Sequence, residues 1–404
     1  MMSKKSPQLR FEGFTDDWEE RKLKDFTIKT GKKNSEGEDH PAYSVSNKLG
    51  LVSQTKQFDG SRLDFLDKTA YKFVNQGEFA YNPARINVGS IAFNDLGKTV
   101  IVSSLYVVLK ISDKLDNEYI LQFIKSIKFI EEVKRNTEGS VREYLFFDNF
   151  KNIKFPYIKN LEEQQKIGSF FKQLDNTITL HQRKLDLLKE QKKGYLQKMF
   201  PKNGAKVPEL RFAGFADDWE ERKLGQYTKL ITKGTTPKDK TGIGDVNFVK
   251  VENITNGKIY PINKIKQNEH DNYLKRSRLE EKDILFSIAG TLGRTAIVNK
   301  SILPANTNQA LAIIRGYDFD TNFLITSLAG NVVKEYIRRN PTVGAQPNLS
   351  LEQVGNLLVN TPNAEEQQKI GSFFKQLDDT IALHQFKLDL LKEQKKGFLQ
   401  KMFV

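Results

Sequence analysis

The sequence has no cysteine among its 404 residues, which excludes disulfide bonds and thiolate metal sites. Histidine is also scarce, and its four copies leave little material for a histidine-based metal or acid–base site. The first ten residues lack the apolar core of a signal peptide, and no uninterrupted apolar run approaches the roughly 18 residues of a membrane span. We therefore expect a soluble, cytoplasmic protein that is not attached to a membrane.

Several signatures of DNA-modifying enzymes are missing as well. No GxxxxGK[ST] string is present to hold a nucleotide phosphate. An adenine methyltransferase would carry an [N/D]PP[Y/F] loop, but the nearest string, Asn82-Pro83-Ala84-Arg85, lacks the second proline and the aromatic residue. We therefore expect no catalytic residue, cofactor or metal on this chain, although its 50 acidic residues leave a carboxylate metal site open.

What the sequence does contain is an excess of positive charge. The 64 Lys and Arg residues exceed the 50 Asp and Glu residues, which gives a net charge of +14 and an isoelectric point near 9.4. An excess of this size favours a polyanionic partner such as nucleic acid. The length is sufficient for two or three domains, each with its own core.

Two segments of the sequence each occur twice. Residues 162–200 return as residues 365–403 with four differences in 39 positions: Asn176/Asp379, Thr179/Ala382, Arg183/Phe386 and Tyr195/Phe398. A shorter segment, residues 8–23, returns as residues 209–224 with three differences in 16 positions. Such self-similarity predicts that the chain contains two copies of one architecture.

Two dissimilar blocks, residues 24–160 and 225–363, lie between the near-copies. We predict a first domain over 1–160, a first long helix over 161–200, a second domain over 201–363 and a second long helix over 364–404. The blocks hold most of the charge excess, with 21 basic and 17 acidic residues in the first and 18 and 12 in the second. The blocks are therefore the expected nucleic-acid contacts.

Apolar residues recur at steps of three and four along both long repeats, which is the a/d spacing of a coiled coil. The predicted seam consists of Ile167, Phe171, Leu174, Ile178, His181, Leu185 and Leu188 in the first repeat, and of Ile370, Phe374, Leu377, Ile381, His384, Leu388 and Leu391 in the second. Lys192 and Lys395 continue the two seams, and we interpret them as snorkelling or register-setting residues.

The order of the segments predicts that the two long helices pair antiparallel within one chain. The first helix runs from block one towards block two, and the second begins where block two ends. Dimerisation between chains is the alternative use of the same seams. We expect His181 and His384 to have packing or register roles rather than to bind a metal.

Both blocks combine strand-like runs with one late amphipathic helix, expected over 117–135 in block one and over 322–339 in block two. Strands are expected over 72–81 and 99–111 in the first block, and over 245–254, 283–288, 295–298 and 310–315 in the second. One fold with two different surfaces accounts for this pattern.

Polar residues in the predicted loops have the chemistry to reach DNA. Arg suits guanine, Asn and Gln suit adenine, and Lys more often holds phosphates. The candidates in block one are Lys32, Lys33, Arg62, Asn82, Arg85, Asn87 and Arg142; those in block two are Lys233, Thr235, Thr236, Lys238, Arg276, Arg278, Arg294, Asn308, Gln309 and Gln346.

Over essentially its whole length the chain resembles the specificity subunits of Type I restriction-modification systems. The resemblance rests on the two EEQQKIGSFFKQLD repeats, the DDWEERKL segments, and the block strings YNPARINVGS, KGTTP, DILFSIAGTLG and NTNQA. It implies an α+β fold with two mixed α/β target-recognition domains, separated by an antiparallel coiled coil of the two long repeated helices in a pseudo-two-fold arrangement.

The same resemblance implies a non-catalytic subunit that reads a bipartite, asymmetric site in double-stranded DNA. Its partners would be two methyltransferase subunits and the restriction/translocase subunits, which would hold S-adenosylmethionine, ATP and Mg. A stand-alone DNA-binding regulator or architectural protein is the alternative, and it would bind tightly without partners.

Overall fold

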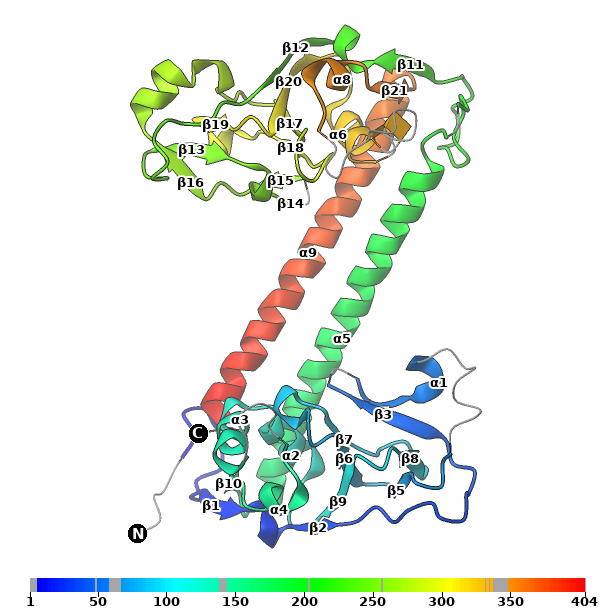
Figure 1. Cartoon of the computed structure of the whole chain (residues 1–404), viewed down its shortest axis with the longest axis vertical. Helices are drawn as coiled ribbons and strands as arrows, with labels where there is room; N and C mark the ends of the chain where they lie inside the picture. Colours follow the sequence, from blue (N-terminus) through cyan, green and yellow to red (C-terminus); the bar gives the residue numbers. More distant parts are fainter. Residues whose placement is uncertain are drawn as a thin grey trace. The chain divides into compact units, whose positions relative to one another are not determined.

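The computed structural model describes residues 6–47, 49–57, 67–137, 144–202, 204–255, 257–330, 332–333, 335–336 and 348–403. The chain divides into two compact units: unit 1 comprises residues 1–180 and 387–404, and unit 2 comprises residues 181–386. Each unit thus contains one half of each long helix, α5 (Leu161–Lys198) and α9 (Ala364–Met402) (Figure 1).

Unit 1 contains two four-stranded sheets. The first has the order β2-β9-β6-β7 and is antiparallel throughout; the second has the order β4-β3-β8-β5, in which β3 and β8 run parallel. Their strands are β2 (Thr27–Lys29), β3 (Ala42–Ser46), β4 (Gly50–Ser53), β5 (Lys72–Val74), β6 (Glu78–Tyr81), β7 (Ile91–Phe93), β8 (Val100–Val102) and β9 (Val107–Ile111). A ribbon of β1 (Glu19–Lys22) and β10 (Lys154–Tyr157) leads into α5.

The shorter helices of unit 1 are α1 (Gln54–Gln57), α2 (Asn117–Ile124), α3 (Ile127–Asn136) and α4 (Phe147–Phe150), with 3-10 turns η1 (Leu23–Asp25) and η3 (Ile86–Val88). The single helix that the sequence predicts over 117–135 is therefore two helices. The break has a local cause: the Ser126 side chain accepts a hydrogen bond from the Phe129 amide, and this cap starts α3.

Unit 2 repeats this plan with different loops. Its four-stranded sheet has the order β12-β20-β17-β18, and its second sheet, β16-β13-β19, again contains one parallel pair, β13 and β19. The strands are β11 (Glu220–Lys223), β12 (Thr228–Lys233), β13 (Val246–Val249), β14 (Ile254–Thr255), β15 (Lys258–Ile259), β16 (Asn263–Ile265), β17 (Ile284–Ser287), β18 (Thr295–Ile297), β19 (Ala305–Thr307), β20 (Leu311–Tyr317) and β21 (Leu358–Thr361). Strands β11 and β21 form the ribbon that leads into α9.

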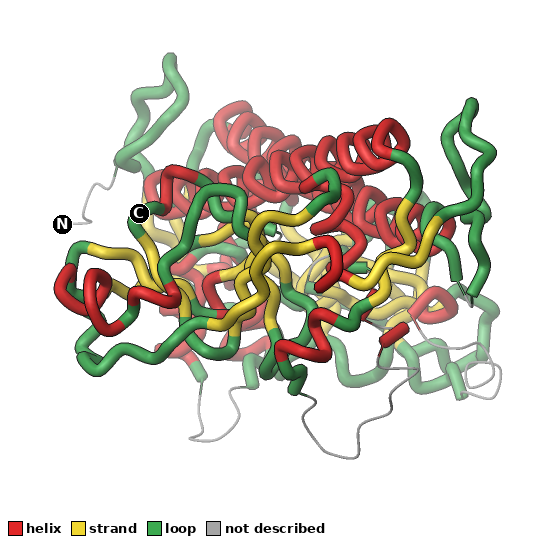
Figure 2. The backbone as a smooth tube through the Cα atoms, turned by 90° about the horizontal axis from the view of Figure 1, so that it is seen from above, coloured by secondary structure: helices red, strands yellow, loops and turns green. Residues whose placement is uncertain are grey.

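The helical elements of unit 2 are α6 (Thr321–Ala329), α8 (Leu351–Gly355), the π-helical turn η6 (Glu269–Tyr273) and the 3-10 turns η4 (Leu224–Tyr227), η5 (Val251–Asn253), η7 (Lys275–Ser277) and η8 (Lys300–Ile302). Strands and helices alternate along the chain in both units; Figure 2 colours the backbone by secondary structure. The predicted α+β fold with two mixed domains is confirmed.

The short repeat links the two long helices within each unit. In unit 1 the Leu9 amide donates to the Lys401 carbonyl of α9 at 3.2 Å. The next residue, Arg10, donates from two nitrogens to both carboxylate oxygens of Glu163 in the first turn of α5, at 2.6 and 2.8 Å. Residues 9 and 10 therefore connect the last turn of α9 to the first turn of α5.

Unit 2 repeats the arrangement with exchanged helices. The Leu210 amide donates to the Lys198 carbonyl of α5 at 2.9 Å, and Arg211 donates twice to Glu366 of α9 at 2.8 Å. Both glutamate side chains are fully buried. The hydrogen bond with Glu163 raises the pKa of Arg10, and the one with Glu366 raises the pKa of Arg211. Each junction is therefore a two-pronged ion pair between a half-buried arginine and a fully buried glutamate.

A glutamine and a glycine in each long repeat hold the neighbouring short helix. The Gln164 side-chain oxygen accepts from the Asp116 amide at 2.7 Å, and the Asp116 carboxylate in turn caps α2. A Cβ on Gly168 would lie 2.7 Å from that carboxylate, so only glycine permits this approach. Gln367, Asp320 and Gly371 make the same contacts with α6 in unit 2.

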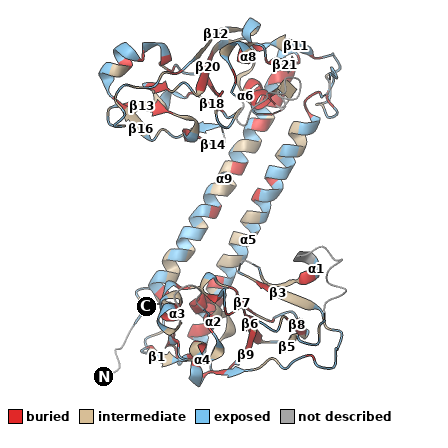
Figure 3. Cartoon of the chain, in the orientation of Figure 1, coloured by how far each residue is buried: buried red, intermediate tan, exposed pale blue. Residues whose placement is uncertain are grey.

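The phenylalanine that ends each long repeat completes the core of one unit. The Phe403 ring lies 5.5 to 6.1 Å from the rings of Tyr119, Phe123 and Phe171 in unit 1. The Phe200 ring lies 5.9 to 6.1 Å from those of Trp219, Phe323 and Phe374 in unit 2. Buried residues gather at these helix ends, whereas the middle turns are mostly exposed or half-buried (Figure 3).

The helices pack antiparallel in both units. In unit 1, the ring centres of Phe170 and Phe398 lie 5.2 Å apart. The Asp175 carboxylate forms an ion pair with the Lys395 ammonium, with 2.5 Å between oxygen and nitrogen. In unit 2, Tyr195 contacts Phe373 at 5.0 Å and Asp378 pairs with Lys192 at 2.5 Å. Numbers rise along one helix as they fall along the other, so the predicted antiparallel, intramolecular pair is confirmed, and the seam lysines form ion pairs across it.

Candidate functional site

Three segments of unit 2 that are distant in sequence meet at one polar surface. We call residues 233–239, 266–278 and 306–309 together the unit 2 polar surface. The first segment crosses directly over the third, because a Cβ on Gly234 would lie 2.1 Å from the Thr307 carbonyl oxygen. The Thr235 amide donates to that carbonyl at 2.9 Å, and the Thr236 hydroxyl bonds to the Gln309 side chain.

Glu269 joins the first segment to the second. One oxygen of its carboxylate accepts from the amides of Lys238 and Asp239, at 2.7 and 3.2 Å. Next to this contact, the Lys238 ammonium lies 4.5 Å from the centre of the Tyr273 ring, within reach of a cation–π interaction. The three segments are thus held as one surface rather than as independent loops.

Eight of the sequence-predicted contacts lie on this surface: Lys233, Thr235, Thr236, Lys238, Arg276, Arg278, Asn308 and Gln309. Arg278 is used internally, since it donates to the His270 carbonyl and to the Asp271 carboxylate, both at 2.9 Å. Arg294 lies away from the surface, on a cavity of about 380 Å³ that Lys192 and Asp378 also line. Gln346 lies outside the described residues.

The candidates of unit 1 form two separate groups. Lys32 and Lys33 follow β2 and are exposed. The Lys32 carbonyl accepts a hydrogen bond from the Phe73 amide, and the backbone of Lys33 forms an isolated antiparallel β-bridge with that of Lys72. Burial and the nearby ammonium groups of Lys29 and Lys33 lower the pKa of Lys72. The pKa shift comes first from burial, and the presence of Lys29 and Lys33 beside Lys72 concentrates positive charge here, which suits a phosphate contact.

The second group of unit 1 follows β6. The Asn82 side chain accepts from the Ala84 amide at 3.0 Å and fixes the turn that presents the exposed Arg85; Asn87 is half-buried in the same loop. Arg62 and Arg142 lie outside the described residues. Arg62 stands in the string Ser61-Arg62-Leu63, which returns in unit 2 as Ser277-Arg278-Leu279.

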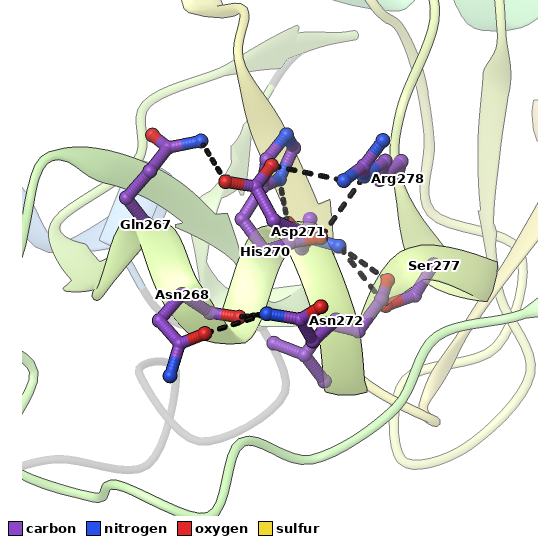
Figure 4. A network of polar contacts seen from close by, with 9 residues as sticks. Gln267, Asn268, His270, Asp271, Asn272, Ser277 and Arg278 are labelled. Atoms are coloured by element: carbon purple, nitrogen blue, oxygen red, sulfur yellow. Dashed lines mark hydrogen bonds and ion pairs between the residues drawn. The ribbon is translucent and has the colours of Figure 1, made fainter.

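Sequence reasoning missed the most amide-rich part of the unit 2 polar surface. Gln267, Asn268 and Asn272 are exposed on and beside η6, and His270 is buried beneath them (Figure 4). Their signal was present in the string QNEHDNY at 267–273, but nothing in it distinguishes a surface helix from a reading element.

All fourteen predicted seam residues of the long helices are buried or half-buried. The pair His181 and His384 face each other with their Nδ1 atoms 3.3 Å apart. In unit 1, burial alone would raise the pKa of the Asp175 carboxyl, but the ammonium groups of Lys125 and Lys395 outweigh burial and hold that pKa below its ordinary value. These contacts set the register of the helix pair.

Among the described residues, no group of three or more His, Asp or Glu side chains is arranged to hold a metal ion. In the same part of the chain, no helix is both long and apolar enough to cross a membrane.

The model of the Type I restriction modification DNA specificity domain matches the chain twice, over residues 15–190 and 216–393. The chain belongs to this family. The two matched regions each begin in a short repeat and end within a long helix, so each match covers the sheets of one unit and most of one long helix.

Two relatives in Methanocaldococcus jannaschii match nearly the whole chain. The specificity subunit of the Type I restriction enzyme MjaVIII is 25% identical over 402 residues, which covers 95% of this chain and 91% of that protein. The putative MjaX specificity subunit is 23% identical over 412 residues, with 95% and 92% covered. The chain is accordingly a Type I restriction-modification specificity subunit.

Solved structures agree on the fold. The S subunit of a Type I restriction-modification system from M. genitalium superposes with a TM-score of 0.64 at 14% identity, over 99% of both chains. A chain from a structure describing complex assembly and conformational transition of the Type I R-M system gives a TM-score of 0.51 at 15% identity, over 95% of this chain and 97% of that one.

Proposed function

We propose that this specificity subunit reads a split, asymmetric sequence in double-stranded DNA, with unit 1 contacting one half-site and unit 2 the other. The main support for the proposal is that the two units have similar sheets and junctions but different loops. Both units contain one four-stranded sheet of the same order, a second sheet with one parallel pair, and matching junctions, whereas the polar residues on their loops differ in kind and position. Equal frames with unlike loops favour two unlike half-sites.

We further propose that the long helices dock two methyltransferase subunits, which restriction/translocase subunits then join. The near-identity of the two long repeats supports this, because two copies of one surface suit two copies of one partner. Methylation and cleavage would take place on those partners, which would bind S-adenosylmethionine, ATP and Mg. This chain would contribute recognition and no catalytic group.

Exchange of block two tests the modular reading. The full chain is expressed in cells with its methyltransferase partner, and methylated bases are mapped across the genome. Replacing residues 225–363 with the corresponding block of an unrelated specificity subunit is expected to change one half-site and to leave the other half-site unchanged. A change in both halves contradicts the proposal.

A second arm of the same experiment addresses the need for partners. The purified chain alone is expected to bind DNA weakly and without methylating it, while the complex with methyltransferase binds the mapped site. Tight, specific binding by the chain alone would instead indicate a stand-alone regulator.

A further inference from the structure

The turn at residues 267–272 of unit 2 stands out because its hydrogen bonds fix it firmly while its outer side remains polar and exposed. Its inner side carries His270, which is 9% exposed, and its outer side carries Gln267, Asn268 and Asn272. The chain here forms a π-helical turn, a rare conformation that often marks functional sites.

His270 attaches the turn to the sheet. Its Nδ1 lies 2.5 Å from the side-chain oxygen of Asn306, a fully buried residue on β19. An amide oxygen only accepts hydrogen bonds, so the imidazole donates from Nδ1. The side-chain nitrogen of Asn306 donates to the Leu274 carbonyl at 2.8 Å and to the Ser277 hydroxyl at 3.2 Å. One buried asparagine therefore bonds to three points of the segment.

Arg278 holds the turn from its other side. Its guanidinium donates to the His270 carbonyl and to the Asp271 carboxylate, and Asp271 accepts from Gln267 at 3.0 Å (Figure 4). On the next face, the Asn272 side-chain nitrogen donates to the backbone carbonyl of Asn268 at 3.1 Å and to the side-chain oxygen of Asn268. The exposed amides are thus ordered before any ligand arrives, which lowers the entropic cost of binding.

The surroundings of the turn are basic. Lys275 and Arg276 follow it and are exposed, and Lys238 lies over the Tyr273 ring beside it. The surrounding cations suit the flanking phosphates of double-stranded DNA.

Gln267 donates one side-chain hydrogen to Asp271 and keeps the other N–H and its oxygen, which suit the bidentate pairing with adenine in the major groove. The Asn272 side-chain nitrogen donates twice to Asn268, so Asn272 offers its side-chain oxygen as an acceptor.

We propose that residues 267–272 form the base-reading element of unit 2, that Gln267 and Asn272 contact an adenine-containing step of its half-site, and that His270 and Asn306 are positioning residues. This inference rests on the proposed function and names the part of unit 2 that performs it.

The test uses the full chain with its methyltransferase partner and maps methylated bases in cells. The double variant Gln267→Ala/Asn272→Ala is expected to lose discrimination at one or two base pairs of one half-site, by roughly 5- to 150-fold per amide contact. The other half-site stays unchanged. The matched control is Asn356→Ala, which removes an exposed carboxamide at the end of α8, an element that packs against η4 and β12.

Two variants separate positioning from folding. His270→Leu removes the donor to Asn306 and is expected to relax the same base pairs, whereas His270→Gln keeps a side-chain N–H and is expected to restore part of the discrimination. Discrimination at the half-site of unit 1, measured in the same methylation maps, reports whether the variant chain is folded. A merely structural role would lower methylation at all sites equally.

The inference is overturned if the double variant methylates the wild-type sequence with wild-type discrimination. In that case a wild-type complex that still methylates a split site leaves the proposed function standing. A wild-type complex that methylates no split site would contradict both the inference and the proposed function.

Discussion

At the scale of single residues, the carboxylates of Glu163 and its neighbour Glu162 lie in opposite environments. Glu163 has a fully buried side chain opposite Arg10, while Glu162, one position earlier, is 69% exposed and pairs with Lys166 along the helix surface. The two residues have the same chemistry and differ in burial. A buried charge that loses its partner is costly, whereas an exposed pair contributes little.

Glu163→Ala is expected to lower the free energy of unfolding by about 3–5 kcal/mol, because it removes a fully buried carboxylate on which the half-buried Arg10 guanidinium and the buried Trp18 indole N–H both depend as an acceptor. Urea denaturation followed by circular dichroism measures the change. Glu162→Ala is the control and is expected to unfold close to the wild-type midpoint. Equal effects from the two variants would show that burial of the Glu163 pair does not determine its contribution.

At the scale of elements, the long helices carry two glycines of opposite character in each copy. A Cβ on Gly168 would lie 2.8 Å from the Tyr119 amide nitrogen, and one on Gly371 would lie 2.7 Å from that of Phe323. Gly194 and Gly397 have nothing within 4 Å of the same position. The first pair permits close packing, and the second pair only weakens the helix.

Gly168→Ala is therefore expected to destabilise the protein by about 1–3 kcal/mol through overpacking against the start of α2. Gly194→Ala is expected to stabilise it by about 1 kcal/mol, since alanine is the better helix former and meets open space. Thermal unfolding of both variants measures whether each substitution raises or lowers the melting temperature. A stabilising Gly168→Ala would mean that α2 shifts away without cost.

At the scale of the whole molecule, each unit combines the first half of one long repeat with the last half of the other. Unit 1 takes residues 387–404 from the far end of the chain, and Phe403 fills a core between α2 and α5. The segment 190–200 differs from 393–403 at one position, Tyr195 against Phe398. A chain of residues 1–200 thus lacks part of unit 1 and carries a near-copy of the missing part.

The fragment 1–200 is expected to form a dimer in which each copy supplies its residues 181–200 to the other. Sedimentation velocity across a concentration series measures the state. Phe200→Ala in the fragment removes the ring that replaces Phe403 and is expected to shift the equilibrium towards monomer. A fragment that stays monomeric and folded would show that unit 1 does not need the borrowed helix end.

The repeats and their periodicity determined the architecture at the level of the sequence alone. Near-identical segments must meet near-identical surroundings, so the copies at 162–200 and 365–403 predict matching junctions, and their a/d spacing predicts the helix pair. The break between α2 and α3 escaped this reading, because the capping bond of Ser126 competes with a continuous amphipathic pattern.

The unit 2 polar surface was decided only by tertiary structure. Its three segments are separated by dozens of residues, and no period in the sequence relates Gly234, His270 and Asn306 to one another. They meet because β13 and β19 run parallel and bring distant loops to one place, where a buried hydrogen bond ties the turn to the strand. Periodicity reports the neighbours along an element, whereas the pairing of strands determines the neighbours across the fold.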